Sequence, residues 1–103
     1  MIALNDVAEQ AYMIAKARDL DTDIIGTLKH CAGEVVEAAE AYTKFVSTES
    51  PDKAEAYKKD LALEIADIII CALTASARIG VDIEDCISRA MQKNAQRAYD
   101  ERK

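Results

Sequence analysis

Apolar residues recur at helical spacing along almost the whole chain, and short polar breaks divide this pattern into four segments. The first segment runs roughly from Leu4 to Arg18, and the second from about Ile24 to Val46. The third extends from Pro51 to about Ile79, and the last begins after Asp82. Apolar positions three and four residues apart are typical of amphipathic helices. The pattern therefore predicts four helices in an antiparallel bundle.

The breaks carry residues that favour helix ends. Residues Asp21 to Asp23 are N-cap candidates for the second helix, Ser50 and Pro51 suit the start of the third, and Gly80 suits its end. Three glycines and one proline are too few for the turns of a β protein. With 103 residues and no long linker, the chain is predicted to be one all-α domain spanning residues 1–103.

The thirteen residues from Leu61 to Leu73 are apolar at every position except Glu64 and Asp67. A helix that is apolar on every side is expected to be buried, yet a chain of this length buries only a modest fraction of its surface by itself. We therefore expect oligomerisation to complete the bundle. An ionised carboxylate in such a run is costly unless it is paired or bound to a metal ion. Because residues three apart share one helix face, the two acids predict a bound cation.

A second acidic pair with the same spacing, Glu34 and Glu37, lies in the second segment. Taken alone, it is better explained as a solvated face, because Glu37 points away from the apolar stripe around Leu28 and Val35. An antiparallel hairpin would nevertheless bring both pairs opposite one another. Such oxygen ligands suit Mg²⁺ or Mn²⁺, which complete their shells with water and substrate phosphates. A di-iron bundle would need E-x-x-H motifs, and the chain contains none.

The last segment carries polar and basic groups that complement these acids. Asn94 lies in the middle of its apolar face, with Arg97 at the edge of that face and Lys93 just outside it. A hydrogen bond between helices explains Asn94 equally well, and the two cations taken alone are typical of a solvated surface. Opposite four carboxylates and a polyphosphate, however, all three would donate to phosphate oxygens.

Charge and cysteine content exclude several classes of protein. A net charge of −6 argues against binding of a nucleic-acid polymer, and the apolar run is too short and too acidic for a membrane span. Cys31, Cys71 and Cys86 lack zinc-site spacing, and no signal peptide is visible. They indicate reduced core cysteines in a cytoplasmic protein.

Three stretches together resemble the MazG-like group of the all-α nucleoside triphosphate pyrophosphohydrolase superfamily: GEVVEAAEAY (33–42), LALEIADIIICAL (61–73) and QKNAQR (92–97). The resemblance spans residues from about 24 to 100. It implies Mg²⁺-dependent hydrolysis of a nucleoside triphosphate between the α and β phosphates, which gives the monophosphate and pyrophosphate. It also implies a homo-oligomer, either a dimer or a pair of dimers.

The resemblance also implies roles for individual residues. It places metal ligands at Glu34, Glu37, Glu64 and Asp67, and phosphate or sugar contacts at Lys93, Asn94 and Arg97. We choose Glu37 as the general base, because the pair in the apolar run is better suited to hold metal alone. Stacking on the base would fall to Tyr12, Tyr42, Phe45 or Tyr99, with His30 beside the pocket.

Two alternatives stay open. One is a related enzyme of the same superfamily that acts on phosphoribosyl-ATP or on dUTP. The other is a non-catalytic helical module for oligomerisation.

Overall fold

The computed structural model describes residues 3–19 and 23–102, and this part of the chain is all helical, with no strand. The helices are α1 (Leu4–Ala17), α2 (Ile24–Ser47), α3 (Pro51–Arg78) and α4 (Ile83–Glu101). The prediction of four helices is confirmed, and the expected bounds of the first three agree closely with those of the structure.

Local signals in the sequence explain where the helices begin and end. Asp23 caps α2, and its carboxylate accepts a 2.7 Å hydrogen bond from the backbone N–H of Gly26. The other two N-cap candidates, at positions 21 and 22, lie outside the described residues. Ser50 caps α3. Gly80 has a φ of 71°, in the left-handed region that favours glycine just beyond a helix end.

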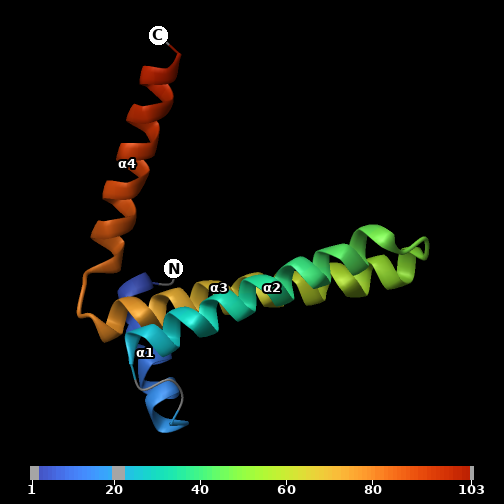
Figure 1. Cartoon of the computed structure of the whole chain (residues 1–103), viewed down its shortest axis with the longest axis horizontal. Coiled ribbons are helices and arrows are strands. Elements are labelled where there is room, and N and C mark those ends of the chain that lie inside the picture. Colours follow the sequence, from blue (N-terminus) through green and yellow to red (C-terminus); the bar gives the residue numbers. More distant parts are fainter. Residues whose placement is uncertain (1–2, 20–22, 103) are drawn as a thin grey trace.

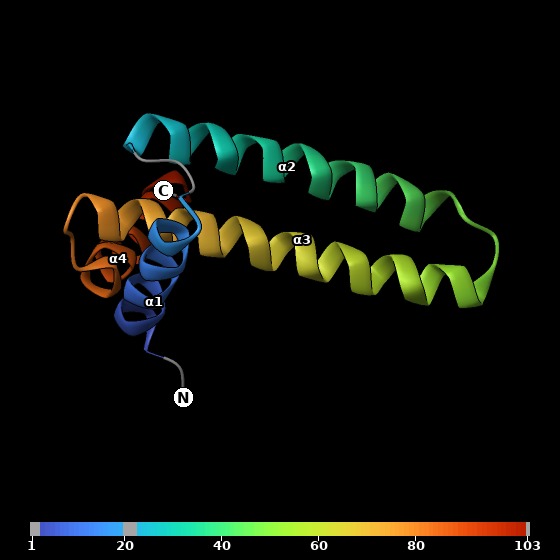
Figure 2. The same cartoon turned by 90° about the horizontal axis from the view of Figure 1, so that it is seen from below.

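Helices α2 and α3 form a long antiparallel hairpin, and α1 crosses the open end of this hairpin, chiefly against α3 (Figures 1 and 2). The buried core is small and lies mostly at this crossing, where short side chains allow the helices to approach closely. Its buried residues are Ala8 and Ala11 of α1, Thr27 of α2, and the α3 residues Leu73, Thr74, Ala75 and Ser76. Ala38 is a further buried residue of α2.

Helix α4 leads away from the hairpin (Figure 1), and none of its residues is buried. Its first turn is tied to α1 by Asn5. The side-chain carbonyl of Asn5 accepts a 3.0 Å hydrogen bond from the N–H of Ile83, and its amide donates a 2.9 Å bond to Asp82. These bonds and the short connection after Gly80 direct α4 outward. One chain therefore forms a hairpin crossed by α1, with an extended α4, rather than a closed four-helix bundle.

Many large apolar side chains are exposed in one chain. They include four from the apolar run of α3: Leu63, Ile65, Ile69 and Ile70. The expected burial of that run is therefore not met within a single chain. The radius of gyration is 16.7 Å, whereas a compact domain of this length has about 13 Å. The accessible surface is 7853 Å², compared with roughly 5,700 Å² from the scaling for compact monomers.

The cysteines show the same lack of cover. Cys31 and Cys71 are partly buried, whereas Cys86 is exposed. The expectation that Cys86 is a core residue is wrong within one chain, because α4 leads away from the hairpin and none of its residues is buried. Among the described residues, no helix has both the length and the apolar character that crossing a membrane requires.

Candidate functional site

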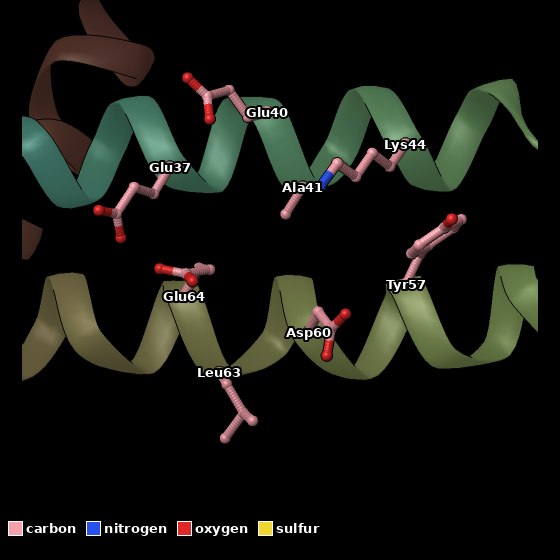
Figure 3. A pocket seen from close by; sticks show the side chains of 8 residues that line it. All are labelled: Glu37, Glu40, Ala41, Lys44, Tyr57, Asp60, Leu63 and Glu64. Carbon is pink, nitrogen blue, oxygen red and sulfur yellow. The ribbon is translucent and has the colours of Figure 1, made fainter.

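Three glutamates from the two helices of the hairpin converge. Glu34 and Glu37 lie on α2 and Glu64 lies on α3, and one carboxylate oxygen from each lies within 4.8 Å of the others. We call these three residues the glutamate cluster. The i,i+3 spacing places the two α2 acids on one side of their helix, and antiparallel packing places Glu64 opposite. Figure 3 shows Glu37 and Glu64 facing each other across the gap between the helices.

Two oxygens of the glutamate cluster are buried and have no partner in the described part of the chain. The Glu34 side chain is only 15% exposed, and its Oε1 lies 3.0 Å from Nε2 of His30. The second oxygen of Glu34 and one oxygen of Glu64 are buried and accept no hydrogen bond within the described part of the chain. Buried polar atoms are normally hydrogen-bonded, and buried carboxylates are normally paired or coordinated to metal. Both the donor type and the orphan oxygens therefore fit a hard divalent cation.

The electrostatics of the glutamate cluster also favour a bound cation. Burial of its carboxyl group raises the pKa of Glu64 above its ordinary value of 4.5. The neighbouring carboxylates of Glu37, Glu34 and Asp67 raise this pKa further, because like charges disfavour the ionised form. A bound cation would reverse the repulsion. The site therefore favours either a proton or a metal ion among these acids.

The fourth predicted ligand lies beside the glutamate cluster but outside it. Asp67 is exposed and does not belong to the group of three converging carboxylates. It raises the pKa of Glu64 and lines a cavity together with Glu34. The expectation that Asp67 is a buried acid is wrong within one chain, because the surface around it is uncovered. Glu37, the predicted general base, is exposed and open to water.

The predicted substrate-binding residues are not brought to the glutamate cluster of the same chain. Lys93, Asn94 and Arg97 lie on α4, which leads away from the hairpin (Figure 1). Lys93 and Arg97 instead line a hollow on α4 itself, together with Asp100. The sequence pattern placed the polar groups on one helix face but carried no signal for the direction in which α4 leaves the core.

Two cavities flank the glutamate cluster. The proximal cavity, of about 400 Å³, lies where α1 crosses the hairpin. The distal cavity, of about 280 Å³, lies between α2 and α3 toward the hairpin tip (Figure 3). Glu34 lines the proximal cavity, and Glu37 and Glu64 line the distal one. The glutamate cluster therefore lies at the junction of two differently shaped spaces.

The chemistry of the two cavities differs. Apolar and small side chains, among them Ala11, Ile14, Ala15 and Ile70, form much of the proximal cavity, which His30, Arg18 and Arg78 also line. The distal cavity is largely polar, and its charged or hydroxyl-bearing residues are Glu37, Glu40, Lys44, Tyr57, Asp60 and Glu64. Apolar walls suit a nucleobase, whereas a polar pocket beside metal ligands suits phosphate.

None of the aromatic residues expected to stack on a base lines either cavity. Tyr12 packs under the guanidinium of Arg78, which lies 5.2 Å from the ring centroid. Tyr42 and Phe45 form an edge-to-face pair with centroids 6.5 Å apart, and Tyr99 is exposed on α4. The first of these rings thus holds α1 against α3, because a cation over an aromatic face is attractive.

Sequence reasoning missed Lys44 and Tyr57 of the distal cavity, although a signal for them was present. Lys44 follows Glu37 by seven residues on α2, and Tyr57 precedes Glu64 by seven residues on α3. Residues seven apart lie on one helix face. Extending each acidic pair by two turns toward the hairpin tip would therefore have identified both side chains.

The raised pKa of Glu64 predicts a pH-dependent stability difference between the wild type and Glu64→Gln without metal. The folded state holds the Glu64 proton more tightly than the unfolded state, so its stabilising effect is present below pH 4.5 and is lost as pH rises through the raised pKa. Glu64→Gln should therefore be more stable than the wild type above that pKa. Urea unfolding in EDTA, at one protein concentration and across acidic to neutral pH, measures the difference.

Glu49→Gln is the matched control, because Glu49 is an exposed acid at the hairpin tip. Its difference from the wild type should vary little over the same pH range. A Glu64→Gln difference that does not change with pH would contradict the proton linkage.

Searches against protein-family models, curated proteins and solved structures found no match for this chain. The glutamate cluster and its two cavities are therefore interpreted from their own chemistry and from the sequence motifs described above.

Proposed function

We propose that this chain is a Mg²⁺-dependent nucleoside triphosphate pyrophosphohydrolase of the MazG-like group, which cleaves between the α and β phosphates. The observation that carries the proposal is the convergence of Glu34, Glu37 and Glu64, whose carboxylate oxygens lie within 4.8 Å of one another. Glu34 and Glu64 each hold a buried oxygen that has no partner among the residues that the structure describes. Oxygen donors arranged in this way suit Mg²⁺, with Mn²⁺ as a substitute.

In the proposed reaction, the metal would be held by Glu34, Glu37, Glu64 and Asp67, and Glu37 would also act as the general base. Bound Mg²⁺ supplies charge neutralisation for the triphosphate and lowers the pKa of a bound water. Glu37, the exposed member of the glutamate cluster, accepts a proton from the attacking water. The water oxygen bonds to one of the two phosphorus atoms joined by the α–β bridging oxygen, while the bond from that phosphorus to the bridging oxygen breaks. The products are the monophosphate and pyrophosphate.

A second copy of the chain completes the bundle and the site in this proposal. One chain exposes about 2,000 Å² more surface than a compact monomer of its mass. This excess is comparable to the area that obligate subunit interfaces bury. The uncovered surface includes the apolar run of α3 and the residues Ile87 and Met91 of α4. In a dimer, or a tetramer of paired dimers, α4 would bring Lys93, Asn94 and Arg97 to the glutamate cluster of its neighbour.

The proposal is tested by incubating the protein with a panel of ribo- and deoxyribonucleoside triphosphates and Mg²⁺. The expected products are the monophosphate and pyrophosphate, and chromatography separates them from diphosphate and phosphate. Release of diphosphate would contradict cleavage between the α and β phosphates. Activity on phosphoribosyl-ATP or dUTP alone would favour the related superfamily enzyme. No hydrolysis of any nucleotide would favour the non-catalytic module.

A further inference from the structure

The two cavities beside the glutamate cluster define a direction for the substrate. Metal ions held by the glutamate cluster would sit at the junction between the proximal and distal cavities, because its members line both. A nucleotide cleaved at that junction must extend its nucleoside into one cavity and its terminal phosphates into the other. The proximal cavity is larger, at about 400 Å³, and has more apolar walls. Arg18 and Arg78 also line the proximal cavity, and the Arg78 guanidinium lies over the Tyr12 ring. The more apolar walls fit the nucleoside, which leaves the distal cavity for the phosphates.

Among the described residues, Lys44 is the one cation that lines the distal cavity. Figure 3 shows its side chain extending from α2 toward Ala41, with the ammonium group on the side that faces α3. Within the described residues 3–19 and 23–102, no ion pair or hydrogen bond involves its ammonium group, although Glu40 precedes it by one helical turn. An ammonium group with free donors in a polar cavity suits a phosphate oxygen.

The acids around Lys44 determine which form of phosphate can enter. Glu37 and Glu64 belong to the glutamate cluster, so bound Mg²⁺ would offset their charge, whereas Glu40 and Asp60 stay negative. Free pyrophosphate would be repelled by this wall of carboxylates. Its Mg²⁺ complex carries less negative charge and is repelled less, and Lys44 adds one attractive cation.

We infer that the distal cavity receives the β and γ phosphates, which leave as Mg²⁺-pyrophosphate, and that Lys44 binds them while the nucleoside lies in the proximal cavity. This inference rests on the proposed pyrophosphohydrolase activity. In this inference, Lys44 contacts phosphate from the same chain as the glutamate cluster. The contacts proposed for α4 come from a neighbouring chain and are additional. Tyr57, which is partly buried in the same cavity, adds a hydroxyl donor.

The test compares Lys44→Gln, Lys44→Arg and the wild type for binding of pyrophosphate and of nucleoside monophosphate in Mg²⁺, by titration calorimetry. Loss of one charge-assisted hydrogen bond should weaken pyrophosphate binding by at least about tenfold in Lys44→Gln. Monophosphate affinity should stay unchanged, because that product occupies the other cavity. Lys44→Arg should retain most of the pyrophosphate affinity, and the KM for triphosphates should follow the same order.

Lys29→Gln is the matched control, because Lys29 is an exposed lysine of α2 that lines neither cavity. It should leave both affinities unchanged, and circular dichroism should show every variant folded. The inference is overturned if Lys44→Gln weakens monophosphate binding instead, or changes only the Mg²⁺ requirement. If the wild type releases pyrophosphate but Lys44→Gln does not alter pyrophosphate affinity, the inference about Lys44 fails while the proposed function stands. A wild type that hydrolyses no nucleotide and binds no pyrophosphate refutes the proposed function itself.

Discussion

The double variant Glu64→Gln with Asp67→Asn is expected to lose Mg²⁺-dependent pyrophosphate release by at least about a thousandfold, because a metal ion contributes several kcal/mol of transition-state stabilisation. The variant should remain folded, since Gln and Asn keep the size of the side chains that they replace. Without metal it should be more stable than the wild type, because Glu64 carries a pKa raised by burial and by neighbouring acids. Pyrophosphate release and thermal unfolding in EDTA measure both effects.

A matched control for this variant changes two acids that lie away from the glutamate cluster. Glu49 and Glu55 are exposed near the hairpin tip and line neither cavity. Glu49→Gln with Glu55→Gln changes the net charge by the same amount and should keep its activity. Unfolding of the Glu64 and Asp67 variant, together with an inactive wild type, would instead identify the acids as part of a structural module.

Mixing two inactive variants is expected to restore activity if α4 serves the neighbouring subunit. One variant carries Glu64→Gln with Asp67→Asn, and the other carries Lys93→Ala with Arg97→Ala. Half of randomly exchanged dimers contain both chains, and each mixed dimer has one complete site. The mixture should therefore regain about a quarter of wild-type activity. Pyrophosphate release measured after subunit exchange or joint refolding gives the result.

A second mixture shows whether the restored activity arises between subunits. A chain that carries all four substitutions, mixed with the wild type, should leave no complete site in a mixed dimer. Activity would then fall to the fraction of dimers that contain only wild-type chains. If the first mixture stays inactive while each variant is folded and oligomeric, Lys93 and Arg97 do not act on a neighbour's glutamate cluster.

The sequence was sufficient for those parts of the structure that depend on local periodicity. Helix bounds followed from apolar spacing, and Asp23 and Ser50 cap helices where their side chains can accept backbone hydrogen bonds. The convergence of Glu34 and Glu37 with Glu64 followed from i,i+3 spacing on two helices that had to pack antiparallel. Here the local pattern and one assumption about packing were enough.

The direction of α4 could not be predicted from periodicity. It depends on hydrogen bonds between Asn5 and residues 77 to 79 positions later in the chain, and helical spacing carries no information about such a contact. The burial of the apolar run was also mispredicted for a single chain, because side chains such as Leu63 and Ile69 remain exposed without a partner. Asp67 lies outside the converging carboxylates, which i,i+3 spacing by itself does not reveal.

The small core at the crossing of α1 and the hairpin has a consequence for how folding depends on concentration. Among the described residues, Leu73 is the largest apolar side chain in that core, and the other apolar core residues are alanines. Such a core contributes little hydrophobic stabilisation against the entropy of ordering a whole domain. If copies associate as proposed, folding and association form a single equilibrium, and dilution unfolds the protein as well as separating its subunits. The concentration of assembled active sites would then rise more steeply than the total concentration of the chain.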